Sequence, residues 1–229
     1  MQRRKFTSGV VSLGGLWALA GRTDAAGFSE GDATLGVRAA LERGAVAAVG
    51  LLGKSGGFLD NPKVRIPLPG FLNDVAKLLK ATGQQKRVDE LITAMNRAAE
   101  AAVPEAKALL VSAVKAMSVG DATRLIRGGD NAVTEFFADK TRTPLGVKFL
   151  PIVTKATEKV SLADKYNRVA GKASGLGLVK KEDANVQQYV TRKALDGLYL
   201  MIGEEERKIR QDPVGTGSAI LGKVFGSLR

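Results

Sequence analysis

The side chains that could do chemistry in this chain are carboxyl, amide, hydroxyl and basic groups, because its 229 residues include no Cys and no His. Those two absences exclude a thiol nucleophile, a disulfide, an imidazole base, and a zinc site of thiolate or imidazole ligands. Acid–base catalysis would have to rest on a pair of carboxyl groups. We assign no catalytic residue, no metal site and no cofactor, and we favour a binding protein over an enzyme.

One polar cluster interrupts an Ala-rich helical segment. Asn96, Arg97 and Glu100 fall within five residues of one another, and Arg97 precedes Glu100 by three. Side chains three apart in a helix lie on the same face, so this pair can form an ion pair. Such a cluster inside an apolar segment indicates either a buried polar network or part of a ligand site.

A run of three glutamates gives a second cluster. Glu204 lies four residues before Lys208, and Glu206 lies four before Arg210, which is the favourable order for ordinary ion pairs on a helix. Glu205 falls on an apolar stripe and is expected to point inward, where a carboxylate needs a basic partner or a raised pKa. We hypothesise that Arg97 or Arg65 is its partner.

The segment from Gly56 to Pro69 combines three prolines, several apolar residues and two cations. Prolines favour extended backbone over helix there. An apolar loop of this length either docks on the core, which we favour, or forms one wall of a binding groove. In the groove interpretation the apolar part of a ligand meets Phe58, Leu59 and Ile66, and its anionic group meets Lys63, Arg65 and Arg97.

The elements that must position these residues are helices, because apolar residues recur at three-four spacing without period-two alternation. We predict an all-α fold: a single compact bundle of roughly eight helices with a Pro-rich loop. The expected helices are 32–52, 71–82, 85–103, a stretch after Pro104, one capped by Ser118 and Asp121, one after Asp130, one starting at Thr143-Pro144, 162–170, 183–210 and 216–228. Residues 171–181 are expected to form a loop.

The first 26 residues have the layout of an export signal. Arg3, Arg4 and Lys5 precede a short apolar stretch over residues 10–20, and small residues follow it. The paired arginines resemble a twin-arginine signal. We therefore expect a leader at 1–26, a single all-helical domain at 27–229, and a periplasmic location.

Several motifs of the expected mature part resemble one bacterial family. They include the Gly56–Pro69 segment, the run from Met95 to Glu100, and the stretch from Tyr189 to Leu198. In this order they are similar to the domain of unknown function 4197, over about residues 32–213. The resemblance implies an exported all-helical domain, and it implies no activity.

The net charge of the chain indicates which class of ligand or surface it would bind. Thirty-five Lys and Arg against 23 Asp and Glu give a net charge of +12, which favours anionic surfaces and ligands. We expect a non-catalytic cell-envelope module that binds an anionic or amphiphilic ligand or a protein partner, with no nucleic acid and no membrane span in the mature chain. The alternative is a hydrolase or lyase of envelope glycan with Glu100 and Glu205 as acid and base.

Overall fold

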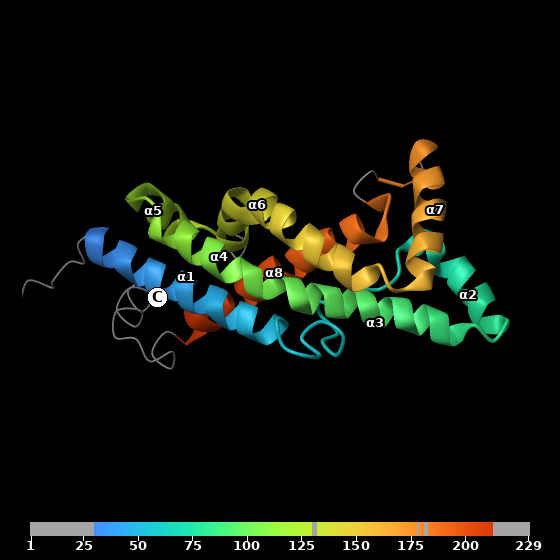
Figure 1. The fold of residues 1–229 in the computed structure, drawn as a ribbon. Helices are drawn as coiled ribbons and strands as arrows, with labels where there is room; N and C mark the ends of the chain where they lie inside the picture. The colour runs from blue at the N-terminus through green and yellow to red at the C-terminus, as the bar shows by residue number, and fades with distance from the viewer. Residues whose placement is uncertain (1–29, 130–131, 178, 181–182, 213–229) are drawn as a thin grey trace, which may run out of the picture.

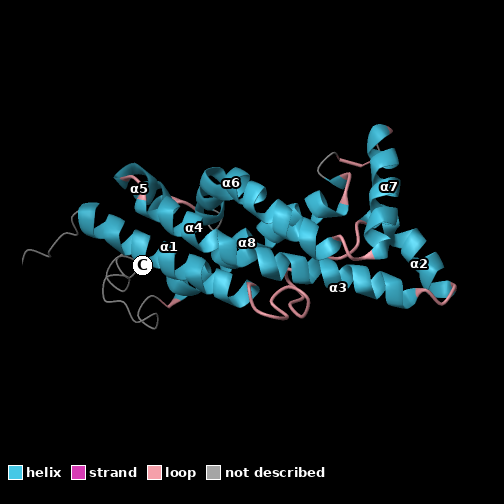
Figure 2. Ribbon diagram, viewed as in Figure 1, coloured by secondary structure: helices cyan, strands magenta, loops and turns pink. Residues whose placement is uncertain are grey.

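The computed structural model describes residues 30–129, 132–177, 179–180 and 183–212. Helices and their connecting loops make up this part of the chain, without a strand, which confirms the all-α prediction (Figure 2). The α-helices are α1 (Glu30–Leu52), α2 (Asn73–Ala81), α3 (Gln85–Ala102), α4 (Ala106–Lys115), α5 (Val119–Arg127), α6 (Ala132–Thr157), α7 (Ser161–Gly175) and α8 (Val186–Gln211). Short 3-10 turns cover Gly70–Leu72 and Val103–Glu105.

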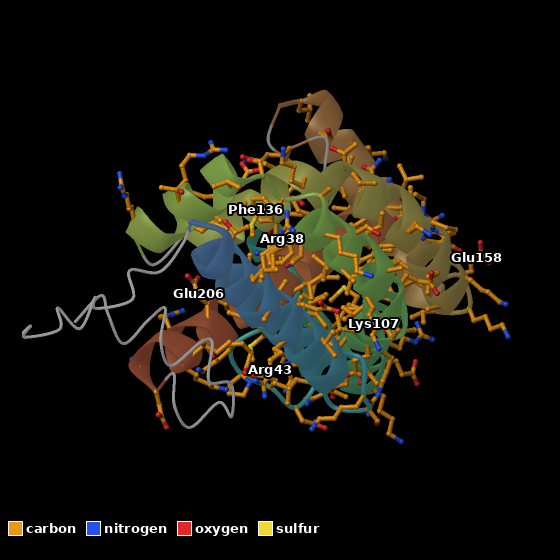
Figure 3. All side chains as sticks on the ribbon, turned by 90° about the vertical axis from the view of Figure 1, so that its left-hand side faces the viewer. Arg38, Arg43, Lys107, Phe136, Glu158 and Glu206 are labelled. Atoms are coloured by element: carbon orange, nitrogen blue, oxygen red, sulfur yellow. The ribbon has the colours of Figure 1, made fainter. Side chains whose placement is uncertain are left out.

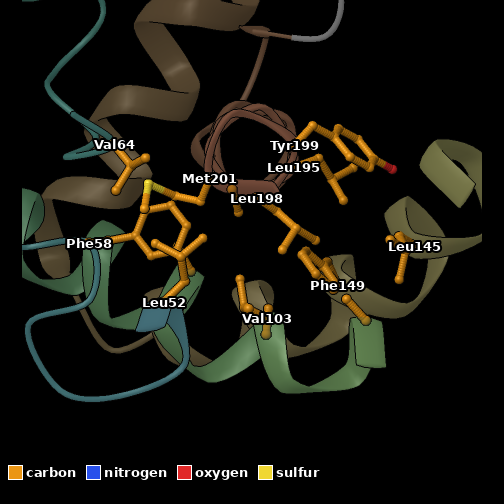
Figure 4. Packing of buried hydrophobic residues seen from close by; sticks show 14 of the residues in the cluster. Leu52, Phe58, Val64, Val103, Leu145, Phe149, Leu195, Leu198, Tyr199 and Met201 are labelled. Carbon is orange, nitrogen blue, oxygen red and sulfur yellow. The ribbon is translucent and has the colours of Figure 1, made fainter. Parts of the chain in front are cut away.

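Helix α8 forms the centre of the bundle. It contacts α6 most extensively, and α1 and α3 pack on it as well (Figure 1). Leu195 and Leu198 of α8 point toward Phe149 of α6 (Figure 4), and all three are buried. Each such side chain contributes about 1.5–3 kcal/mol relative to leaving it in water. Packing on this centre therefore positions α1, α3 and α6.

Helix α6 corrects one prediction. It runs without a break from Ala132 to Thr157, so no helix starts at Thr143-Pro144, and both Pro144 and Pro151 lie inside it. A proline in a helix removes one backbone hydrogen bond and costs about 3 kcal/mol. Both proline rings are on the exposed side. The apolar face continues past them, with Leu145, Phe149 and Val153 buried in the core.

The connection between α7 and α8 is shorter than expected. Helix α7 continues to Gly175, so the predicted loop over residues 171–181 is wrong for its first five residues. Helix α8 begins at Val186, because the side chain of Asn185 accepts a hydrogen bond from the Gln188 N–H at 2.8 Å and caps it there. The predicted start at residue 183 was three residues too early.

Other boundaries follow the sequence signals. Ser118 and Asp121 form the expected capping box at the start of α5. The expected leader 1–26, the cap at Asp130 and the tail helix 216–228 lie outside the described residues. Among the described helices, none combines the length and the apolar character needed to cross a membrane.

Candidate functional site

The Pro-rich segment is docked on the core, which confirms the favoured interpretation of that loop. Phe58, Val64 and Ile66 are buried, and Phe58 packs near Leu52 of α1 and Met201 of α8 (Figure 4). The loop reaches this position because α8 has Gly197 beneath it: a Cβ there would lie 2.8 Å from Cε1 of Phe58. A helix without a side chain at that point lets the loop approach closely.

Glu100 holds the start of this loop from α3. Its Oε1 accepts hydrogen bonds from the backbone N–H groups of Phe58 and Leu59, both at 3.0 Å. Its Oε2 accepts one from Nη1 of Arg97 at 2.6 Å, so the predicted Arg97–Glu100 pair is confirmed. Nη1 of Arg97 also donates to Oγ of Ser55 at 2.8 Å. The carboxylate is buried and fully engaged in positioning the loop.

Asn96 holds the end of the loop in the same way. Its Oδ1 accepts from the Ile66 N–H at 2.8 Å, and its Nδ2 donates to the carbonyl oxygens of Ile66 at 2.9 Å and Ile92 at 2.8 Å. One residue further on, the Tyr189 hydroxyl donates to the Pro67 carbonyl at 2.9 Å. Buried polar side chains are expected to be hydrogen-bonded, and here all but one of these partners, the Ile92 carbonyl of α3, are loop backbone groups.

The cations of the loop lie on its outer side. Lys63 is exposed and its Nζ forms an ion pair with Glu204 of α8 at 2.7 Å. Arg65 is exposed, and within the described part of the chain its guanidinium has no ion pair or hydrogen-bond partner. Leu59 is half-buried. Of the nine predicted ligand residues, eight thus lie on this loop or on the part of α3 that holds it, and most of their polar groups are engaged in positioning the loop.

Glu205 is the ninth, and its hypothesised partners were wrong. It forms an ion pair with Lys208 of its own helix, rather than with Arg97 or Arg65. The buried glutamate is its neighbour Glu206, which lies on the face that Ile202 and Ile209 turn inward. The four-three spacing of residues 202, 206 and 209 was a signal of this in the sequence.

The pKa of Glu100 bears on the alternative function, an enzyme that uses Glu100 and Glu205 as acid and base. Burial raises the pKa of Glu100, but the N–H donors of Leu59 and Phe58 and the Arg97 guanidinium outweigh it and hold the pKa below its ordinary value. A general acid needs the opposite shift, so that its proton is available near neutral pH. Glu100 therefore stays ionised near neutral pH, so it cannot serve as the general acid of the expected acid–base pair.

A cavity of about 430 Å³ lies next to the loop, between α2, α3 and α7. None of the nine predicted residues lines it; the loop contributes only Leu68. Its lining is Leu68, Leu72, Ala76, Leu79, Val88, Leu91, Leu162, Lys165, Tyr166, Arg168, Val169 and Lys172. The volume is within the range of about 300–1,000 Å³ that small-molecule sites occupy. Sequence reasoning missed it because five separate segments meet to form its wall.

The charge at this cavity has one sign. Lys165, Arg168 and Lys172 are the charged lining residues, and all three come from α7. All three are exposed, and none has an ion-pair or hydrogen-bonded side-chain partner within the described residues. The rest of the lining is apolar except for the Tyr166 hydroxyl. The cavity therefore offers an apolar interior beside three cations for which the described part of the chain supplies no counter-charge.

Tyr166 forms the wall between the cavity and the core. It is buried, its ring meets that of Phe71 edge-to-face at 6.0 Å, and it lies 6.4 Å from the ring of Tyr189. Burial raises the pKa of the Tyr166 hydroxyl well above its usual range, with the neighbouring Tyr189 and Asp183 acting in the same direction. Tyr166 is thus a neutral wall residue at any physiological pH.

Comparison with known proteins gives one match. The model of a family described as "Protein of unknown function (DUF4197)" matches residues 27–226. No curated protein and no solved structure matches the chain. The matched range includes the loop, its supports on α3 and α8, and every residue that lines the cavity.

Proposed function

We propose a function for this chain from the premise that it belongs to the DUF4197 family, whose description assigns none. The chain is a non-catalytic binding module that takes a single-chain anionic amphiphile into the cavity between α2, α3 and α7. One observation carries this proposal: three cations that have no counter-charge among the described residues stand beside an otherwise apolar cavity.

The two parts of the ligand match two parts of the cavity. An acyl chain among Leu79, Val88 and Leu91 leaves water, and each CH₂ buried is worth about 0.8 kcal/mol. A carboxylate, sulfate or phosphate head remains near Lys165 and Lys172. Ion pairs between exposed groups contribute only about 0.2–1 kcal/mol each. The apolar chain therefore supplies most of the affinity, and the cations supply the preference for a negative head.

This placement moves the ligand away from the loop residues expected to bind it. Glu100 and Asn96 are buried and bonded to the loop backbone, Arg97 is bonded to Glu100, and Lys63 is paired with Glu204. Groups already engaged with the protein have little capacity left for a ligand. The three cavity cations have no such partners within the described ranges of the chain.

The proposed location is the cell envelope, after loss of residues 1–26. The basic start, the short apolar run and the small residues that follow it support this location. The family match starting at residue 27 agrees with the same division. A basic exported protein meets anionic lipids and lipid-derived amphiphiles there.

The test is isothermal titration calorimetry of the protein with dodecanoate and with dodecyltrimethylammonium. The two probes have the same chain and opposite head charges, so we expect dodecanoate to bind several-fold more tightly than dodecyltrimethylammonium. Lys165→Gln/Lys172→Gln should weaken dodecanoate binding by up to about fivefold per charge removed. Lys107→Gln/Lys115→Gln, which removes two exposed lysines of α4, should not.

The location of the binding site is tested by Ala76→Phe. This substitution places a ring inside the cavity and should abolish binding of dodecanoate. Absence of dodecanoate binding to the unmodified protein refutes the proposal. Equal affinity for the two probes refutes the role of the cations, and full affinity in Ala76→Phe refutes the location.

A further inference from the structure

We propose that the cavity-side face of α7 docks the protein on an anionic lipid bilayer, so that the amphiphile passes between bilayer and cavity. This inference rests on the proposed function and names the source of its ligand. The docking face is defined by the apolar residues Val169 and Leu176, the latter being the C-cap residue just after α7, and by the cations Lys165, Arg168 and Lys172.

The face is amphipathic along the length of α7. Val169 and Leu176 are seven residues apart, which puts them on the same side of a helix, and they are 43% and 76% exposed. Lys165 and Lys172 are also seven apart and fall on the same side. Exposed apolar side chains flanked by cations are the pattern of helices that lie in a bilayer interface.

The position of α7 leaves this face accessible. Helix α7 projects from the long axis of the bundle, with α2 beside its base (Figure 1). Turned by 90°, the molecule again shows α7 extending beyond the other helices (Figure 3). Two apolar side chains are exposed nearby. Phe71, in the 3-10 turn just before α2, is 37% exposed, and Leu78 of α2 is 65% exposed. This end of the molecule thus offers apolar side chains on two neighbouring elements.

Charge favours a bilayer over the other possible occupants. A second copy placed face to face would bring Lys165, Arg168 and Lys172 against their own counterparts, and like charges repel. An anionic bilayer instead offers negative headgroups to the cations and an acyl region to Leu176. The cavity opens on the same face of α7, so docking would bring it to the surface where amphiphiles are found.

The expected strength follows from the three cations. Each Lys or Arg close to an anionic membrane surface strengthens binding about fivefold, so three of them give about a hundredfold preference for anionic over neutral vesicles. The attraction is screened by salt, because the Debye length falls to about 3 Å at 1 M ionic strength. High salt should therefore release most of the protein from anionic vesicles.

The experiment is flotation of the full chain with vesicles of phosphatidylcholine alone or mixed with phosphatidylglycerol. We expect binding to the mixed vesicles only. Leu176→Gln should weaken it about tenfold, because this side chain is the most exposed apolar group of the face. Val147→Gln is the matched control: Val147 is 72% exposed on α6, outside the docking face, and its loss should change nothing.

Two variants separate this inference from the proposed function. Leu176 does not line the cavity, so Leu176→Gln should keep dodecanoate binding while losing vesicle binding. Ala76→Phe should do the reverse. If Ala76→Phe and Leu176→Gln each lose both activities, a separate docking face does not exist.

Three other outcomes overturn the docking proposal. The first is dodecanoate binding without any binding to phosphatidylglycerol vesicles. The second is an equal loss of vesicle binding in Val147→Gln and Leu176→Gln. The third is self-association in size-exclusion chromatography that Leu176→Gln abolishes, which assigns the face to a second copy. Lys165→Gln/Lys172→Gln provides an independent check, since it should weaken vesicle binding about 25-fold.

Discussion

Glu100→Gln should destabilise the protein by about 2–3 kcal/mol, because a charged acceptor that holds the loop becomes a neutral one. Hydrogen bonds to charged groups contribute about 1.5–3 kcal/mol and those to neutral groups about 0.5–1.5, so the Phe58 and Leu59 bonds lose about 1 kcal/mol each. The amide NH₂ would also face the Arg97 guanidinium, donor against donor. That side chain is 41% exposed, so its share is below about 1 kcal/mol.

Urea unfolding followed by far-UV circular dichroism measures the change in the free energy of unfolding. Trypsin provides a local measurement, since the loop holds Lys63 and Arg65, and cleavage there should accelerate in Glu100→Gln. Two controls bracket the effect. Arg97→Gln should cost at most about 1 kcal/mol, and Glu90→Gln, at an exposed site of α3, less than about 0.5 kcal/mol.

The stabilisation that Glu100 provides should depend on pH, and the direction of its pKa shift fixes the sign of that dependence. The folded-state pKa of Glu100 lies below its ordinary value of 4.5, so ionised Glu100 stabilises the fold fully above pH 4.5. That contribution is lost as the pH falls through the folded-state pKa. The stability difference between the unmodified protein and Glu100→Gln should be constant near neutrality and shrink in acid. A difference below about 0.5 kcal/mol at neutral pH, or one that grows in acid, would refute the role given to Glu100.

The remaining predictions concern backbone approach, capping and the tyrosines. Gly197→Ala should lower stability by about 1–3 kcal/mol in thermal unfolding, because the new methyl group meets Phe58, whereas Gly50→Ala, where a Cβ meets nothing within 4 Å, should not. Asp121→Ala should cost about 1 kcal/mol, because the Ser118 N–H and hydroxyl lose the carboxylate that accepts from them in the α5 capping box. Hydrogen bonds from the Ser118 N–H and hydroxyl lower the pKa of Asp121 to about 2, so urea unfolding should show this cost undiminished down to pH 3.8 and falling below it. Burial raises the pKa of Tyr189 to about 12, so an ultraviolet titration of Tyr189→Phe should match that of the unmodified protein through pH 10.

Local sequence patterns predicted most of the helices. The three-four spacing in α1, α3 and α8 is read correctly because each of these helices buries one continuous apolar face. The Ser118 cap and the Arg97–Glu100 pair were also predictable, since both link residues three apart on one element. Interactions within one turn of helix depend little on the rest of the fold.

Features that depend on distant segments were not predictable in the same way. Local rules place a helix start at Pro144, but packing on α8 and α3 keeps α6 continuous through it. The partner of Glu204 was expected within its own helix, and the structure gives it Lys63, 141 residues away along the chain. The cavity is the extreme case, because α7 must first pack beside α2 and α3 before any wall exists.

The polar cluster and the cavity are parts of one arrangement. Asn96 fixes Ile66, and the Tyr189 hydroxyl fixes Pro67, so the backbone enters the cavity wall at Leu68 from a defined point. The Tyr189 ring also lies against Tyr166, which lines the cavity itself. A site with an apolar wall keeps its shape only if the backbone behind that wall is fixed. In the proposed function, the buried amide and carboxylate of α3 would therefore act on the ligand through the loop they position, while the exposed cations of α7 would act on it directly.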